Sequence, residues 1–133
     1  MMPTFQQERL VQYRLLLERL GQRPYPESAE LALRRDDALK AVQLLREATF
    51  PILGGDVYVQ REGHIESAYA NWHSNPKVGE DRETYLCRSW DTTETYLTGY
   101  PQIDGEEPLF VIVAGEPQTT VDPKYVLAAG GNK

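Results

Sequence analysis

Cysteine is nearly absent from this chain of 133 residues, which has Cys87 alone. A single thiol can form neither an intramolecular disulfide nor a cysteine-based zinc cluster. Long apolar runs are lacking too: the longest is residues 109–114, whereas a membrane-spanning helix needs about 20 apolar residues. The first ten residues have no apolar stretch typical of a signal peptide. These absences predict a soluble cytoplasmic protein with no membrane partner.

Positive charge is also scarce. The chain has 14 lysines and arginines against 20 aspartates and glutamates, which gives a net charge of −6 and a pI near 4.9. Nucleic-acid binding needs clustered basic side chains, so this balance argues against a nucleic-acid partner. Residues 80–107 have two arginines and eight acidic residues, which are Glu80, Asp81, Glu83, Asp91, Glu94, Asp104, Glu106 and Glu107. Such a segment is either a solvated face or a landing surface for a basic partner.

Apolar residues at helical spacing predict three helices, over residues 4–20, 28–48 and 81–98. In the first helix, Thr4 is a suitable N-cap and Gly21 can end the helix in a left-handed turn. The second helix is either continuous or interrupted, because Asp36 or Asp37 can cap a fresh start in its middle.

After Pro51, apolar residues recur at every second position, which indicates strands. We expect three strands, over residues 56–60, 64–73 and 109–114. A hairpin turn at 61–63 is expected to join the first two. Gly54 and Gly55 are expected to form the bend that leads from helix to strand.

The order α-α-β-β-α-β predicts an α+β fold, in which a small, mostly antiparallel sheet has helices packed on one face. The length corresponds to one domain. We place this domain at residues 1–116 and expect residues 117–133 to be a C-terminal tail that is only partly ordered.

Few residues suggest catalysis or metal binding. His64 and His73 are nine positions apart on a predicted strand, so they lie on opposite faces and are poorly placed to share a metal. Cys87 is expected to be a small, buried or half-buried thiol. Gly54 and Gly55 precede Asp56 in a segment that lacks the Gly-Lys-Ser/Thr sequence of a phosphate-binding loop.

Four short segments resemble a known family. They are DDALK (36–40), PILGGDVY (51–58), ANWH (70–73) and YLCRSW (85–90), followed by Tyr96. Together they make the chain similar to the immunity proteins encoded beside toxin genes in bacterial polymorphic toxin systems, most nearly to the immunity protein 40 family.

This resemblance implies a small α+β protein that binds and neutralises a cognate toxin domain, with no catalytic residue, no cofactor and no metal. Charge opposite to that of a basic toxin would select and accelerate the encounter, and indoles, if exposed, would add binding energy. We therefore expect toxin contacts at Asp56, Trp72, Asp91, Glu94, Asp104, Glu106 and Glu107.

Two other classes stay open from the sequence. An adaptor or chaperone of a secretion system would share the acidic, cofactor-free character. A small hydrolase or transferase would use His73, Cys87 and Asp56, and would need these groups to converge in a concave pocket. An inhibitor would instead show a large acidic surface with an apolar rim.

Overall fold

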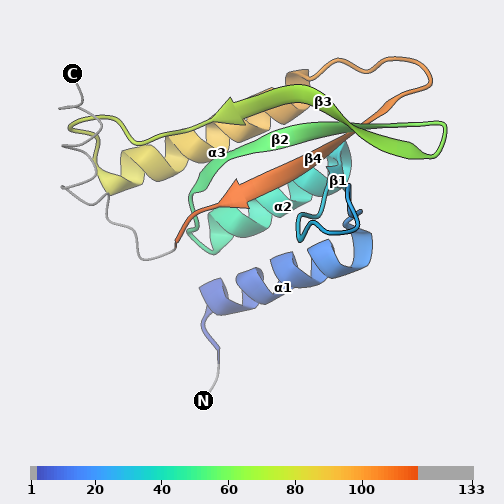
Figure 1. Ribbon diagram of the computed structural model, residues 1–133. Helices are drawn as coiled ribbons and strands as arrows, with labels where there is room; N and C mark the ends of the chain where they lie inside the picture. The colour runs from blue at the N-terminus through green and yellow to red at the C-terminus, as the bar shows by residue number, and fades with distance from the viewer. Residues whose placement is uncertain (1–2, 117–133) are drawn as a thin grey trace.

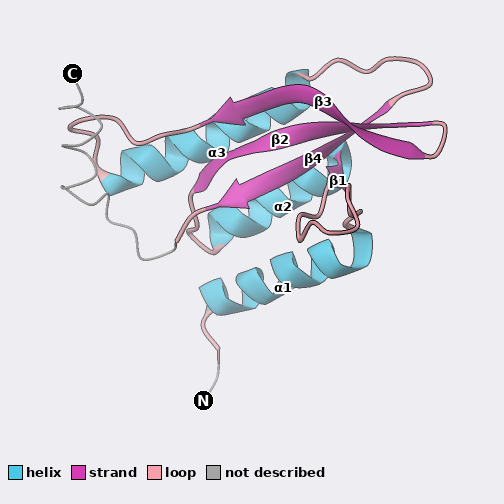
Figure 2. Cartoon of the chain, in the orientation of Figure 1, coloured by secondary structure: helices cyan, strands magenta, loops and turns pink. Residues whose placement is uncertain are grey.

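The computed structural model describes residues 3–116, so the tail expected at 117–133 lies outside the described residues. The elements in order are α1 (Phe5–Leu20), β1 (Leu33–Arg34), α2 (Arg35–Glu47), β2 (Ile52–Arg61), β3 (His64–His73), α3 (Arg82–Gly99) and β4 (Glu107–Ala114). The strands form an antiparallel sheet in the order β1-β4-β2-β3. Helices α2 and α3 lie behind this sheet in Figure 1, and α1 packs against α2. The α+β class is therefore confirmed (Figure 2).

Helix α1 has the predicted start. The Thr4 hydroxyl accepts a hydrogen bond from the Gln7 backbone N–H at 3.1 Å, and the Gln7 side chain accepts one from the Thr4 N–H at 2.7 Å. The predicted left-handed end is wrong, because Gly21 is extended, with φ −70° and ψ 138°. Glycine is needed there for space: an added Cβ would lie 2.5 Å from the Leu17 carbonyl oxygen.

The helix expected over 28–48 begins only at Arg35. Two of the preceding residues, Leu33 and Arg34, belong to the sheet instead: Leu33 pairs with Phe110 of β4 and is 1% exposed. Asp36 and Asp37 are not caps but lie in the first turn, where a carboxylate interacts favourably with the helix dipole. Pairing with a strand distant in sequence thus overrides helical spacing before residue 35.

Strand β2 begins at Ile52, so Gly54 and Gly55 lie within a strand and not in a bend before it. A Cβ on Gly55 would lie 2.3 Å from Cη2 of Trp72, and one on Gly54 would lie 2.2 Å from the Trp72 carbonyl oxygen. The two glycines therefore allow Trp72 of the neighbouring strand to approach β2 closely.

The predicted hairpin between β2 and β3 is confirmed. Arg61 pairs with His64, and the two residues between them, Glu62 and Gly63, have φ values of 52° and 83°. Positive φ at both positions is typical of the two-residue turns that match the twist of a hairpin.

Apolar side chains fill both faces of the sheet, but to different extents. The main core lies between the sheet and the helices and includes Leu45, Val57, Trp72, Leu97 and Phe110. A smaller cluster on the opposite face consists of Ala32, Tyr58, Leu109 and Val111, with Ile65 packed against it. Within residues 3–116, no helix is long and apolar enough to cross a membrane.

Candidate functional site

Both tryptophans are buried in the core. Trp72 is 5% exposed, its indole N–H donates to the Thr93 hydroxyl at 3.0 Å, and its ring stacks on Tyr96 with centroids 4.8 Å apart. Trp90 is 7% exposed and donates to the Phe50 carbonyl oxygen at 2.7 Å. The condition for a binding role, an exposed indole, is not met by either residue. Trp72 therefore holds β3 against α3 and is withdrawn from the expected contacts.

The acidic segment 80–107 is partly neutralised by arginines, three of which come from other elements. Four of its carboxylates form ion pairs, which are Glu80 with Arg88 (2.7 Å), Asp91 with Arg46 (2.8 Å), Glu106 with Arg61 (3.0 Å) and Glu107 with Arg34 (3.5 Å). Glu94 and Asp104 are exposed, and neither forms an ion pair in the described part of the chain. The concentration of charge in the sequence therefore does not become one unopposed acidic surface.

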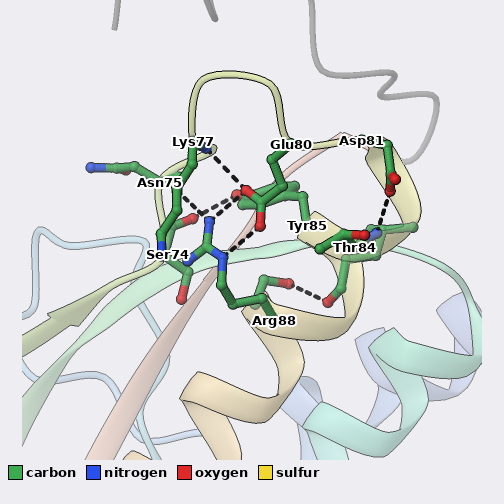
Figure 3. A network of polar contacts seen from close by, with 10 residues as sticks. Ser74, Asn75, Lys77, Glu80, Asp81, Thr84, Tyr85 and Arg88 are labelled. Atoms are coloured by element: carbon green, nitrogen blue, oxygen red, sulfur yellow. Dashed lines mark hydrogen bonds and ion pairs between the residues drawn. The ribbon is translucent and has the colours of Figure 1, made fainter. Parts of the chain in front are cut away.

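The Glu80 carboxylate organises the connection from β3 to α3 (Figure 3). It accepts two hydrogen bonds from the Arg88 guanidinium, at 2.7 and 2.8 Å, and one from the Lys77 backbone N–H at 3.0 Å. Arg88 also donates to the Asn75 carbonyl oxygen at 2.6 Å. The hydrogen bonds from Arg88 are the main reason that the pKa of Glu80 is lowered, and the same bonds raise the pKa of Arg88.

Two further contacts fix both ends of this connection. The Tyr85 hydroxyl donates to the Ser74 carbonyl oxygen at 2.7 Å, and the Asp81 carboxylate caps α3 by accepting from the Thr84 N–H at 2.7 Å. The acids at the start of the segment thus have structural roles.

The sheet face opposite α2 and α3 is the remaining candidate for binding. Strand alternation places Val57 and Trp72 on the helix side, so Asp56, Asn71 and His73 point to the other side. The exposed or half-buried side chains on this side form a surface that we call the open sheet surface. It also includes Tyr69, which bulges from edge strand β3. Its members are Leu53, Asp56, Tyr69, Asn71, His73 and Val113.

Tyr69 is the most exposed large side chain of this surface, at 93%. The register between β2 and β3 shifts here, because Val57 pairs with Ala70 and Tyr58 with Ser67, which leaves Ala68 and Tyr69 unpaired. Tyr69 has φ 55°, and its backbone N–H donates to the Ser67 hydroxyl at 3.0 Å. Sequence reasoning did not select Tyr69 as a binding residue, although its alternation with Asn71 and His73 was the available signal for this face.

Two hollows lie on the open sheet surface, and Asp56 lines both. One, of about 250 Å³, is bordered by Leu53, His73 and Val113 around Gly54. The other, of about 380 Å³, is bordered by Glu30, Tyr58, Ser67, Tyr69, Ala70 and Asn71. Neither hollow is lined by lysine or arginine. The surface is therefore mildly acidic and partly apolar.

Glu30 holds the Tyr58 side chain in the second hollow. The Tyr58 hydroxyl donates to the Glu30 carboxylate at 3.2 Å, and the Tyr25 ring packs edge-on against Tyr58 at 5.8 Å. Burial, with the negative charges of Glu30 and Asp56, raises the pKa of Tyr58 to about 12. The hydroxyl therefore stays a proton donor at neutral pH.

The three residues considered for catalysis do not share one site: Asp56 and His73 border the same hollow, but Cys87 lies on α3, away from it. Cys87 is exposed on α3, contrary to the expectation of a buried or half-buried thiol. His73 and Asp56 lie on the sheet face that α3 does not cover. Across residues 3–116, no group of three or more histidine, cysteine, aspartate and glutamate side chains is close enough to hold a metal ion.

Comparison with known proteins identifies a family. The family model described as Immunity protein 40 matches residues 17–114, from the last turn of α1 to the end of β4. This range is about three quarters of the chain. No curated protein and no solved structure matches.

Proposed function

The chain belongs to the immunity protein 40 family, and we propose that it binds a cognate toxin domain in the bacterial cytoplasm and neutralises it without catalysis. The observation that carries the proposal is the extent of the family match, which includes β1–β4, α2 and α3. An inhibitor of this kind needs a stable scaffold with a shaped surface, and it needs no reacting group.

The separation of the candidate catalytic groups supports inhibition by contact. His73 and Cys87 lie on opposite sides of the sheet, and the hollows beside Asp56 are bordered by apolar and hydrogen-bonding side chains. The proposed mechanism is therefore steric and electrostatic: the bound protein covers the toxin's working surface.

The acidic residues contribute to this proposal unequally. Glu94, Asp104 and Asp56 have no basic partner within residues 3–116, so their charge acts at a distance on an approaching basic protein. Asp91, Glu106 and Glu107 are each paired with an arginine, which cancels most of their long-range field. We assign the first group to electrostatic attraction, and we expect the second group to contribute little to it.

Co-expression tests the function directly. The C-terminal domain of the toxin encoded by the neighbouring gene is expressed in a bacterial host with and without this chain. We expect the domain alone to arrest growth, and the two together to permit growth and to elute as one complex in gel filtration. A toxin domain from an unrelated system is the control, and it should remain toxic.

The outcome that contradicts the proposal is equally specific. If growth is not restored and no complex forms, the inhibitor function is wrong. Affinity capture from the native cell extract then decides the alternative, because recovery of secretion machinery alone would favour an adaptor or chaperone.

A further inference from the structure

Within residues 3–116, no helix packs on the open sheet surface, and it is the sheet face that α2 and α3 leave uncovered. Antiparallel sheets commonly bury one face and present polar side chains to water on the other. Here the segment before β1 covers the area around Tyr58, through Tyr25 and Glu30. Beyond it, Leu53 is 40% exposed and Val113 is 42% exposed. Exposed apolar groups beside polar ones on an uncovered face are typical of a protein-binding surface.

The charge on this face has one sign. Asp56 and Glu30 line the larger of its two hollows, and no lysine or arginine lines either hollow. Neither carboxylate forms an ion pair in the part of the chain that the structure describes, whereas Asp91, Glu106 and Glu107 each do. A partner with a basic side chain would therefore meet charge that no ion pair within residues 3–116 opposes.

Tyr69 adds a fixed aromatic ring at the rim of that hollow. Its backbone is held by the Ser67 hydroxyl, and its 93% exposed ring makes almost no contact that could stabilise the fold. A tyrosine in a preformed position loses little conformational freedom when it is covered, and tyrosine is enriched among residues that dominate binding energy. A guanidinium or ammonium group near its ring would also gain a cation–π contact.

We propose that the open sheet surface is the docking face for the toxin domain, and that the hollow between Tyr69, Glu30 and Asp56 receives an arginine or lysine side chain of that domain. This inference rests on the proposed function and adds the face and the chemistry of the contact. Leu53 and Val113 pack against apolar groups beside the basic residue. The paired carboxylates of α3 and β4 lie outside the contact.

The test compares two double variants of the full chain. The first, D56N with Y69N, removes one charge and one exposed ring from the open sheet surface; asparagine tolerates the positive φ at position 69. The second, E83Q with V78N, removes one charge and one exposed apolar side chain from α3 and the loop before it, and is the matched control. Thermal melting and circular dichroism establish that both variants fold.

Binding of the toxin domain from the neighbouring gene is measured by calorimetry at about 50 mM and about 300 mM salt. We expect the D56N/Y69N variant to bind at least tenfold more weakly, with a flatter salt dependence, and the control to bind within twofold of the wild type. Binding of D56N/Y69N within twofold of the wild type would overturn the docking face and leave the inhibitor function standing. If the wild type does not bind the domain at all, both proposals fail.

Hydrogen–deuterium exchange on the wild-type complex gives an independent measurement. The proposal expects slower exchange of backbone amides in residues 53–73 when the toxin domain is bound. Protection confined to α1 and α2, where the Leu15, Leu20 and Leu44 side chains line another groove, would place the partner there and overturn the proposal.

Discussion

At the scale of single residues, the shape of the main core depends on one close approach. Gly55 lies directly under the indole of Trp72, which in turn donates to Thr93 and stacks on Tyr96. Two neighbouring strands and α3 are thus packed through one aromatic ring. Any side chain at position 55 would compete with this ring for the same volume.

The substitution G55A tests this packing. Its Cβ would lie 2.3 Å from Cη2 of Trp72 and 2.2 Å from the Val111 carbonyl oxygen, so one of these neighbours has to move. We expect the free energy of unfolding to fall by about 3 kcal/mol, measured by urea denaturation. The control is G99A in α3, where nothing lies within 4 Å of the added Cβ, and this variant should be as stable as the wild type or slightly more stable. Equal stability of the two variants would contradict the packing role of Gly55.

Glu80 is a second residue whose contribution to stability can be measured, because that contribution depends on pH. Its pKa is lowered in the folded state, so the stabilisation is complete above the ordinary pKa of 4.5 and is lost as the pH falls through the lower, folded value. We expect E80Q to cost about 2 kcal/mol at pH 7, because Arg88 keeps fewer charged hydrogen bonds. The difference between wild type and variant should shrink in acid, as measured by urea midpoints between pH 7 and pH 3. An exposed glutamate in the first turn of α3 provides the control, since E83Q should change the midpoint little at pH 7. A constant difference at all pH values would refute the role of the Glu80 carboxylate.

At the scale of elements, β3 is the edge strand whose pairing is least regular. Its two unpaired residues interrupt the ladder between Val57 and Tyr58, and one of them, Tyr69, has a left-handed backbone. Bulges of this kind make an edge strand a poor template for another strand, which limits aggregation. They also turn a side chain outward, and in β3 that side chain is the exposed ring of Tyr69.

The bulge predicts a conflict between stability and binding at position 69. Tyrosine at φ 55° is strained, and its 93% exposed ring contributes little burial, so Y69N should raise the free energy of unfolding by about 0.5–1 kcal/mol. The measurement is again urea denaturation. Glu62 at the hairpin turn has φ 52° and is also exposed, so E62N should give a similar gain and serves as the comparison. A loss of more than about 1 kcal/mol in Y69N alone would mean that the ring supports the fold, because an exposed ring alone carries no such energy.

At the scale of the whole molecule, ion pairs between distant segments rearrange the charge. Arg34, Arg46 and Arg61 reach Glu107, Asp91 and Glu106, three of the carboxylates expected to bind the toxin. Exposed pairs of this kind contribute only about 0–1 kcal/mol each to stability. Their larger effect is on the electrostatic field, since each arginine cancels an acidic charge that the linear sequence leaves unopposed.

This redistribution of charge predicts that two substitutions change the rate of toxin association in opposite directions. E94Q removes an unpaired negative charge and should slow association severalfold at low salt, whereas R34Q releases the charge of Glu107 and should accelerate it. Stopped-flow measurements at about 50 mM and about 300 mM salt give the comparison, and both effects should nearly vanish at the higher salt because of screening. Rates that are the same for wild type and both variants at low salt would exclude electrostatic attraction of a basic toxin.

The sequence alone determined the features that depend on neighbouring residues. The capped start at Thr4, the helical spacing of α3 and the turn at 62–63 are properties of short segments, and each was predictable because its hydrogen bonds join residues a few positions apart. The resemblance to the immunity protein 40 family also came from short segments, and the family match over residues 17–114 confirms it.

Tertiary structure decided the features that depend on residues far apart in the chain. Strand β1 exists because Leu33 pairs with Phe110, and Trp72 is buried because Gly55 and α3 leave room for its ring. The ion pairs of the acidic segment likewise join different elements. No local pattern contains such information, because the free energy of these contacts is gained only after the chain has brought distant segments together. The open sheet surface with Tyr69 at its edge belongs to the same class of feature.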